Sequence, residues 1–470
     1  MSFQSQKVSQ KFEESNQGQE DAIEAILEGW EEGNEFIFPI VDGPPGTGKT
    51  RVAVLAASKY ALENNKQQIA YLTYTNEAAE KAREEFFNLG WDSTAVLRLT
   101  ANQNEKDSEK GIIGCSWDLS SLKDPDELRR IRQAPILIST LYSSGRIFNP
   151  KVHYSHPLII VDEFSQVSPS LYFSTLSQIT NSQYNPSGYA LLGDPNQLPV
   201  ITSQPLLRPN IGIFVFRRKN YNPHHLILQY RMHEKICEIV NGLREAILAR
   251  PPLQSHQSVR TRTLADPTLG YTWDLNRCSA DFQDILDSKN PCVVINTDNL
   301  PNQEERTLGK SVCYREEAQL TVNIASEMVR SYKDKNGEPL RPIILSPYNA
   351  QREIIQRYFQ ENKELRRQCL TIFKAQGREY PCVIISFTRK NDGKEIGFLG
   401  ENFEGGIAEG DIGMRAQTYV ACSRAQGKLI ILLSFKTFRG HRDYDFLLEK
   451  AQQGNALMVD AKPEGVNIND

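Results

Sequence analysis

A glycine-rich loop near the start of the chain has the residue types and the spacing that hold a polyphosphate. It follows the pattern G-x-x-x-x-G-K-T and reads Gly43-Pro44-Pro45-Gly46-Thr47-Gly48-Lys49-Thr50. The apolar run at 36–41 predicts a buried strand before the loop, and a helix is predicted to begin near Thr50. Backbone N–H groups and a helix N-terminus then point at one spot, which suits phosphate oxygens. We expect Lys49 to reach the β- and γ-phosphates of ATP and the Thr50 hydroxyl to bind Mg²⁺. The loop residues expected to contact the nucleotide are Gly43, Pro44, Gly46, Thr47, Gly48, Lys49 and Thr50.

Carboxylates follow a second apolar run. The segment 157–161 ends in Asp162 and Glu163. Side chains at the carboxyl end of a buried parallel strand face the ligand crevice. Asp162 is expected to bind Mg²⁺, and Glu163 to polarise the attacking water. A further strand and polar turn at 189–199 place the amide of Gln197 where it could touch that water and the γ-phosphate; without the other motifs this segment would read as a plain turn.

The elements that must position these residues alternate between strand and helix. Strands are predicted at 69–75, 135–140 and 157–161, with helices at 52–62 and 77–87. This alternation is typical of a parallel sheet covered on both faces, and it resumes from 316 to 434. The sequence therefore predicts an α/β protein with two tandem domains, 1–222 and 223–455. Within them, 101–132 is interpreted as a short insertion, 250–312 is the least readable segment, and 456–470 is predicted to be a tail.

Composition limits the class of protein. The chain has 470 residues, of which 39% are hydrophobic and 24% charged, enough for two or three globular domains. The net charge of −4 does not exclude a nucleic-acid partner, because a basic groove can lie on an acidic surface. The eight cysteines include no C-x-x-C pair, so we expect buried thiols in a reducing compartment and no zinc site. The sequence has no signal peptide and no apolar run of 18 residues, so we expect a soluble cytoplasmic protein without a membrane partner.

The ordered set of motifs resembles the superfamily 1 helicases. The motifs are Asn16-x-x-Gln19, GPPGTGKT at 43–50, TYTNEAAEK at 73–81, VDEFSQ at 161–166, GDPNQLPV at 193–200, QYRMH at 229–233, SPYNAQ at 346–351, QGRE at 376–379 and VACSRAQ at 420–426. QYRM and SPYNAQ are similar to the up-frameshift-like branch, which includes nonsense-decay, immunoglobulin-switch-binding and replication helicases. The resemblance covers nearly the whole chain.

The resemblance implies two RecA-like domains with ATP in the cleft between them. Gln19 matches the glutamine that reads the adenine edge, and Tyr230 matches the aromatic residue that stacks on the base. Arg231 and Arg424 match two arginines that reach the γ-phosphate, a task suited to a planar, permanently charged guanidinium. The alternatives are a helix-start residue for Gln19 and a surface ion pair for Arg424.

The resemblance also implies contacts with single-stranded nucleic acid that lies across both domains. Gly377 and Glu379 match the motif that couples nucleotide to strand, with Glu379 near the ribose. The residues that match sugar-phosphate contacts in the family are Thr75, Asn76, Thr140, Tyr348 and Gln351. Such contacts carry no sequence code, and helix caps or turns are the alternative for the threonines and the asparagine.

The function implied is a Mg²⁺- and ATP-dependent helicase that moves along single-stranded DNA or RNA as a monomer, 5′ to 3′ as in its branch. The motif TYTNEAAEK also resembles that of the repair-helicase branch, so movement from 3′ to 5′ is an alternative direction. An ATP-gated binding or remodelling module without strand separation is a second alternative, and a metabolic kinase is a distant third. The sequence departs from the family at DEFS, at CSRAQ and at Tyr314. Since it begins almost at Gln19, we also expect no β-barrel before that residue.

Overall fold

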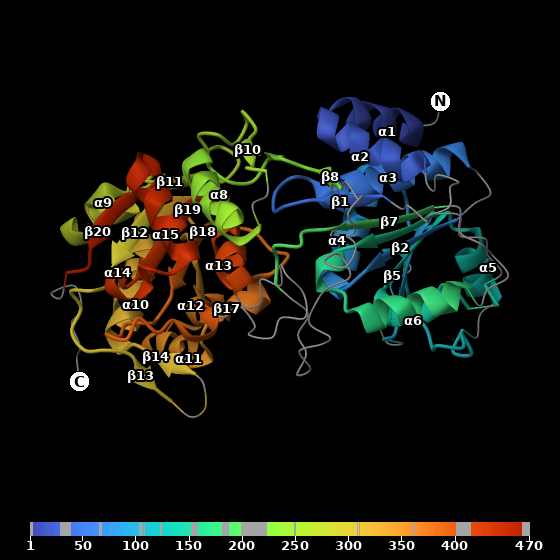
Figure 1. Ribbon diagram of the computed structural model, residues 1–470. Helices are drawn as coiled ribbons and strands as arrows, with labels where there is room; N and C mark the ends of the chain where they lie inside the picture. Colours follow the sequence, from blue (N-terminus) through green and yellow to red (C-terminus); the bar gives the residue numbers. More distant parts are fainter. Residues whose placement is uncertain are drawn as a thin grey trace. The chain divides into compact units, whose positions relative to one another are not determined.

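The computed structural model divides the chain into two compact units (Figure 1). Unit 1 comprises Met1–Pro195 and Pro199–Ile227, and unit 2 comprises Asn196–Leu198 and Leu228–Asp470. The structure describes residues 3–28, 39–64, 68–102, 107, 109–122, 125–149, 151–152, 158–180, 188–198, 223–248, 251–307, 309, 311–360, 362–400 and 415–462. Residues 36–38 of the predicted first strand and the predicted domain boundary at 222 lie outside these ranges.

Unit 1 contains an eight-stranded sheet in the order β4-β3-β5-β2-β6-β7-β1-β8. All neighbouring strands in it are parallel. Its elements are α1 Phe3–Glu13, α2 Gln17–Glu28, β1 Ile40–Asp42, α3 Lys49–Glu63, β2 Ile69–Thr73, α4 Asn76–Asn88, β3 Val96–Thr100, β4 Ile112–Gly114, α5 Pro125–Gln133, β5 Ile136–Thr140, the 3-10 helix η1 Leu141–Arg146, β6 Leu158–Asp162, the 3-10 helix η2 Phe164–Gln166, α6 Pro169–Thr180, β7 Gly188–Gly193 and β8 His224–His225.

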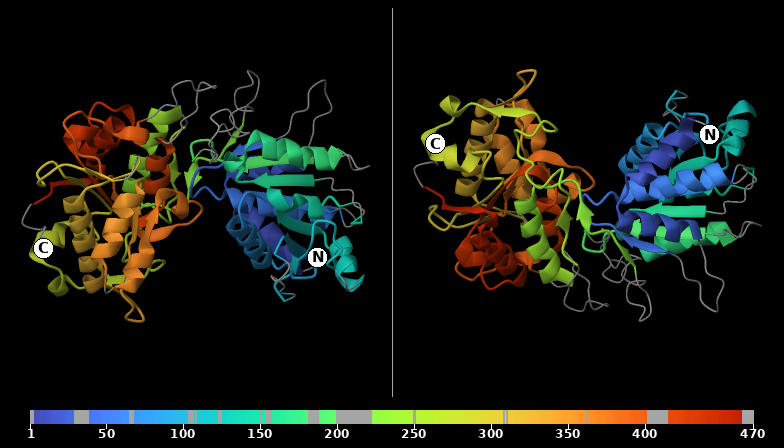
Figure 2. Two further views of the ribbon diagram at one scale, coloured as in Figure 1. Left: turned by 90° about the horizontal axis from the view of Figure 1, so that it is seen from below. Right: turned by 90° about the horizontal axis from the view of Figure 1, so that it is seen from above.

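Helices cover both faces of this sheet, and each face has its own core (Figure 2). Successive residues of β2 alternate between the cores: Ile69 and Tyr71 pack with α2, α3 and α4, whereas Ala70 and Leu72 pack on the face of α5 and α6. Period-two alternation between two apolar layers explains why the strand reads as a continuous apolar run. Because the strands are parallel, β1, β2, β5, β6 and β7 all end at one edge of the sheet.

Unit 2 contains a six-stranded sheet in the order β17-β16-β18-β19-β12-β20, again with parallel neighbours. Its elements are β9 Leu228–Gln229, α8 Glu234–Leu248, β10 Gln254–Ser255, β11 Tyr271–Trp273, η4 Leu275–Arg277, η5 Ala280–Phe282, α9 Gln283–Leu286, β12 Cys292–Asn296, β13 Glu305–Arg306, β14 Val312–Cys313, α10 Arg315–Ser331, β15 Tyr332–Asp334, β16 Ile343–Ser346, α11 Asn349–Tyr358, α12 Lys363–Gln368, β17 Cys369–Thr371, η6 Ile372–Ala375, β18 Tyr380–Ser386, η7 Gly397–Leu399, α13 Ala416–Cys422, β19 Ala425–Leu433, α14 Phe435–Phe438, α15 Arg442–Lys450, η9 Ala451–Asn455 and β20 Leu457–Asp460. Residues of α8, α13 and α15 fill one core, and residues of α10, α11 and α12 fill the other.

The α/β prediction is confirmed, with a parallel sheet in each unit. The prediction that residues 456–470 form a tail is wrong for Leu457–Asp460, because this segment forms the edge strand β20 parallel to β12. The main chain of that segment finds hydrogen-bond partners on β12 that a tail would lack. The segment 101–132 also contributes to the sheet, through β4 at its edge beside β3.

All eight cysteines are buried and free, as the sequence predicts. Burial raises the thiol pKa of Cys237, Cys292 and Cys382 to about 12, so these side chains remain neutral core residues. No helix in the described part of the chain is both long and apolar enough to cross a bilayer.

Candidate active site

The phosphate loop joins β1 to α3 and is shaped by its glycines. Gly46 and Gly48 have φ values of 82° and 81°, in the left-handed region that side chains with a Cβ rarely adopt. A Cβ on Gly43 would come within 2.7 Å of the Lys49 Cβ atom, so the loop can fold back over the helix start only with glycine there. Thr47 closes the turn by donating its hydroxyl to the Pro44 carbonyl at 2.7 Å.

Gln19 ties the start of α2 to this loop. Its amide nitrogen donates to the Thr47 carbonyl at 2.9 Å, and its amide oxygen accepts the backbone N–H of Asn16 at 3.3 Å. The Asn16 side chain in turn accepts the backbone N–H of Gln19 at 3.1 Å, which makes a reciprocal helix cap. The helix-start interpretation therefore describes Gln19 in this conformation, and the bond to Thr47 places its amide beside the loop.

The first residues of α3 meet the end of β6. Lys49 Nζ lies 3.1 Å from Asp162 Oδ1 and 2.6 Å from Glu163 Oε1, and the Thr50 hydroxyl donates to Asp162 Oδ2 at 3.0 Å. Lys49 and Asp162 are buried, with side-chain exposures of 7% and 1%. Only β7 lies between β1 and β6, so the sheet order itself brings the loop and the carboxylates together.

This pairing determines the charge states. Burial lowers the pKa of the Lys49 ammonium, but the charges of Asp162 and Glu163 raise it by more, so the net pKa lies above its ordinary value. Burial raises the pKa of the Asp162 carboxyl, but Lys49 and the hydrogen bonds to the carboxylate lower it by more. Lys49 and Asp162 are therefore both charged at neutral pH, and the ammonium lies between the carboxyl groups of Asp162 and Glu163.

Glu163 is held in an uncommon backbone conformation. Its φ of 60° and ψ of 38° are left-handed, which costs a residue with a Cβ about 1–3 kcal/mol. Its backbone N–H donates to Asp162 Oδ1 at 2.8 Å. Its Oε2 atom is buried and has no hydrogen-bond partner among the described residues. Such an oxygen is suited to accept a proton from water.

Tyr71 on β2 completes the site, although sequence reasoning did not identify it. Its hydroxyl donates to Asp162 Oδ2 at 3.0 Å, and its ring packs edge-on against Phe86 with centroids 5.8 Å apart. Burial raises the pKa of this phenol, and the Asp162 charge raises it further, so it remains a donor. The available signal was a tyrosine inside an otherwise apolar strand, because a buried hydroxyl needs a partner.

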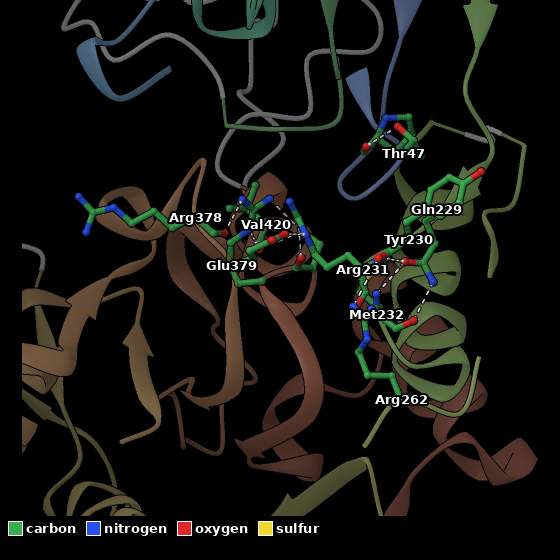
Figure 3. A network of polar contacts seen from close by, with 12 residues as sticks. Thr47, Gln229, Tyr230, Arg231, Met232, Arg262, Arg378, Glu379 and Val420 are labelled. Carbon is green, nitrogen blue, oxygen red and sulfur yellow. Dashed lines mark hydrogen bonds and ion pairs between the residues drawn. The ribbon is translucent and has the colours of Figure 1, made fainter. Parts of the chain in front are cut away.

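In unit 2 the two predicted arginines follow β9 and α13 by two residues each. Figure 3 shows Arg231 beside Glu379. Arg231 Nε donates to Glu379 Oε2 at 2.5 Å, and its Nη1 donates to the Ser423 carbonyl at 3.1 Å. Arg424 donates from Nε to the Val420 carbonyl at 3.0 Å and from Nη1 to the Arg378 carbonyl at 3.2 Å. The surface-ion-pair alternative for Arg424 is wrong, since the residue is 2% exposed and donates to main-chain carbonyls.

Three further predicted residues lie in unit 2. The Tyr230 ring faces the His256 ring, with centroids 4.6 Å apart and an interplanar angle of 32°. Gly377 has a φ of 81°, which favours glycine in the turn before β18. Gln197 is 5% exposed, and its amide oxygen accepts from Gln376 at 3.2 Å.

Two family models match the chain, both described as an AAA domain, over residues 35–203 and 214–434. The DNA replication ATP-dependent helicase/nuclease DNA2 of Saccharomyces cerevisiae is 25% identical over 90% of this chain and 26% of its own length. DNA2 of Mus musculus is 26% identical, over 86% of this chain and 36% of its own length. Regulator of nonsense transcripts 1 of Dictyostelium discoideum is 24% identical, over 89% of this chain and 31% of its own length. The chain belongs to the up-frameshift-like branch of the superfamily 1 helicases. It spans about a quarter to about a third of the length of these relatives.

Three of the residues predicted to contact a nucleic-acid strand lie where the β-strands of unit 1 have their carboxyl ends. Thr75 caps α4, with its hydroxyl accepting the backbone N–H of Ala78 at 3.1 Å. The exposed Asn76 accepts from Arg98 Nη2 at 3.0 Å, and Thr140 ends β5. The cap interpretation therefore holds for Thr75, while Asn76 remains at the surface.

The other two residues predicted to contact the nucleic-acid strand are buried in unit 2. Tyr348 is 2% exposed and donates its hydroxyl to the Ile396 carbonyl at 3.3 Å. Gln351 is fully buried; its amide accepts the backbone N–H of Tyr314 at 2.8 Å and donates to Ser386 Oγ at 2.9 Å. In this conformation both side chains make hydrogen bonds inside unit 2. This corrects the prediction that they contact the nucleic-acid strand.

Proposed function

We propose that this protein is an ATP-dependent helicase that hydrolyses ATP to move along single-stranded DNA or RNA and to unwind duplexes. The observation that carries the proposal is the assembly of Lys49, Thr50, Asp162 and Glu163 at one edge of the first sheet. Membership of the helicase family supports it.

Two side chains fit Mg²⁺. Thr50 Oγ1 and Asp162 Oδ2 lie 3.0 Å apart, and both are hard oxygen ligands of the kind that this ion takes. When bound, the ion would neutralise charge on the β- and γ-phosphate oxygens. The loop N–H groups and Lys49 would hold those phosphates.

The Lys49 contacts imply an exchange of partners. Lys49 is bound to both carboxylates; a phosphate that takes its ammonium would release Glu163 Oε1. Glu163 then acts as the base that takes a proton from water, with its backbone held at φ 60°. Arg231 and Arg424 are proposed to supply positive charge to the γ-phosphate, and Tyr230 to stack on the base. Thr75, Asn76 and Thr140 are proposed to contact the strand backbone.

The decisive test is steady-state ATPase of the full chain without nucleic acid, with single-stranded DNA and with single-stranded RNA. The relatives are named for DNA replication and for nonsense transcripts, so both polymers belong in the assay. Strong stimulation by either is expected, and stimulation by neither would contradict a strand-coupled motor. Duplexes with a 5′ or a 3′ single-stranded tail test the proposed 5′ to 3′ direction.

Glu163→Gln tests the base. ATP binding should persist, while turnover should fall at least about 100-fold, since a positioned base contributes on the order of 10²–10⁴-fold. Undiminished turnover in Glu163→Gln would show that another group takes the proton.

A further inference from the structure

Tyr230, the residue proposed to stack on the base of ATP, has its own ring packed against a histidine. The ring centroids of Tyr230 and His256 lie 4.6 Å apart, at an interplanar angle of 32°. This separation lies in the range at which aromatic rings attract one another in offset-stacked pairs. Both side chains are partly exposed, so the pair lies at the surface of unit 2. The contact therefore needs an explanation other than the packing of a core.

The pairing of two short strands brings the rings together. The strands β9 Leu228–Gln229 and β10 Gln254–Ser255 are parallel, and their last residues pair with each other. Tyr230 and His256 each follow these last residues by one position. Because neighbouring parallel strands advance by the same distance per residue, this register places the two side chains next to each other.

The imidazole of His256 is held in place by its own loop. The backbone N–H of His256 donates to the Gln229 carbonyl at 3.0 Å. The backbone N–H of Ser258 donates to His256 Nδ1 at 3.2 Å, and Ser258 Oγ lies 2.8 Å from the same nitrogen. The first contact fixes the main chain of His256, and the other two fix the direction of its ring. His256 is therefore a fixed surface against which the Tyr230 ring packs.

The main chain around Tyr230 is held by other residues. Gln229 is fully buried, and its amide oxygen accepts the backbone N–H of Arg231 at 2.8 Å (Figure 3). Arg262 Nη1 donates to the Tyr230 carbonyl at 3.4 Å and to the Arg231 carbonyl at 3.0 Å. These contacts do not involve the His256 side chain, so we expect His256 to act on the ring of Tyr230 and not on Arg231.

We propose that His256 is a positioning residue for nucleotide binding, whose imidazole holds the Tyr230 ring in the orientation on which the base of ATP stacks. The inference rests on the proposed function, since it requires Tyr230 to contact the base. A ring that is already held loses less conformational freedom when the base binds. The base is remote from the bond that breaks, so this contribution is the same in the ground state and in the transition state. His256 therefore contributes to KM for ATP and not to kcat.

The test is steady-state ATPase of the full chain at varied ATP concentration, with inorganic tripolyphosphate as a competitor that has phosphates but no base. His256→Ala should raise KM for ATP about 2- to 12-fold, the effect of losing one aromatic pair, with kcat unchanged. The inhibition constant of tripolyphosphate should stay constant, because this competitor has no base to stack. In the Tyr230→Ala background, His256→Ala should not raise KM any further.

Two matched variants separate the ring of His256 from its hydrogen bond. His256→Phe keeps a ring but loses the acceptor for the Ser258 N–H, and its KM should be near that of wild type. His256→Asn keeps an acceptor but has no ring, and it should behave like His256→Ala. The reverse order, with a wild-type KM in His256→Asn and a raised KM in His256→Phe, would overturn the proposal in favour of a role in the loop.

Other results would also overturn the proposal. An unchanged KM in His256→Ala would show that the ring contact has no effect on ATP, and a lowered KM would show that the imidazole occupies the place of the base. An equal loss of affinity for ATP and for tripolyphosphate would indicate a general disturbance of the site. A further rise in KM on adding His256→Ala to Tyr230→Ala would show that His256 acts independently of Tyr230. If wild type hydrolyses no ATP, the proposed function fails and this inference fails with it; if wild type hydrolyses ATP, each result above concerns His256 alone.

Discussion

Lys49 is expected to stabilise the protein even when no nucleotide is bound. Its ammonium is the cation that contacts both Asp162, which is 1% exposed, and Glu163, which is 18% exposed. Replacing it by methionine keeps most of the side-chain volume but leaves two carboxylates without their counter-ion. Breaking a buried pair in this way costs roughly 3–5 kcal/mol. Because Glu163 is partly exposed and can reorient toward water, we expect the lower end, about 3 kcal/mol.

The measurement is differential scanning calorimetry of the nucleotide-free full chain. In a unit of this size about 1 kcal/mol shifts the midpoint by about 2–4 °C, so Lys49→Met should lower the transition of unit 1 by about 6–12 °C at pH 8. Lys59→Met, on the same helix but with its ammonium 4.2 Å from the Phe12 ring, is the matched control and should shift it by less than about 3 °C.

The pH dependence gives the sign of the effect. In the wild type, the paired Asp162 has a lowered pKa, so its contribution to stability is present above the ordinary carboxyl pKa and is lost as pH falls. In Lys49→Met the unpaired carboxylate would have a raised pKa and would destabilise the fold as pH rises. The difference between variant and wild type should therefore be larger at pH 8 than at pH 5. Adding Glu163→Gln should recover part of the loss, and equal midpoints for Lys49→Met and wild type at both pH values would refute the reasoning.

Two further substitutions test single contacts. Tyr71→Phe removes one of the hydrogen bonds that orient Asp162. We expect the Mg²⁺ concentration for half-maximal ATPase to rise about 3- to 10-fold, while nucleotide affinity without Mg²⁺ stays constant. An unchanged Mg²⁺ requirement would contradict this role. Burial raises the pKa of Glu317 to about 7, so ionising it costs stability as pH rises toward and past that value. The free energy of unfolding of Glu317→Gln should therefore exceed that of wild type by up to about 3 kcal/mol at pH 8.5, and should not exceed it at pH 5. Denaturant unfolding at both pH values measures this. A gain that does not depend on pH would count against it.

Residues that act within one motif were predictable from the sequence. Lys49 and Thr50 begin a helix, and Asp162 and Glu163 end a strand, so their positions follow from local pattern alone. Continuous apolar runs predicted the central strands for the same reason, since strands buried on both faces have no polar side. The segment 457–460 was missed because a four-residue edge strand followed by polar residues carries too little pattern to distinguish it from a tail.

Contacts between distant segments were not predictable in this way. Tyr71 and Asp162 are 91 residues apart in the chain, and only the pairing of β2 with β6 makes them neighbours. Tyr348 and Gln351 have residue types that suit a surface contact, yet the packing of α11 turns both inward. The orientation of a side chain on a helix depends on which face its neighbours cover, and a single sequence does not specify that.

Local spacing and short apolar runs were enough to predict the α/β class and the phosphate loop. Which groups meet follows from the tertiary structure: Lys49 lies between two carboxyl groups, Tyr71 contacts Asp162, and the Trp117 indole lies against Gly145 of η1. The physical reason is that strand order and helix packing are set by the burial of the whole chain, whereas motif chemistry is set by residues that are neighbours in sequence.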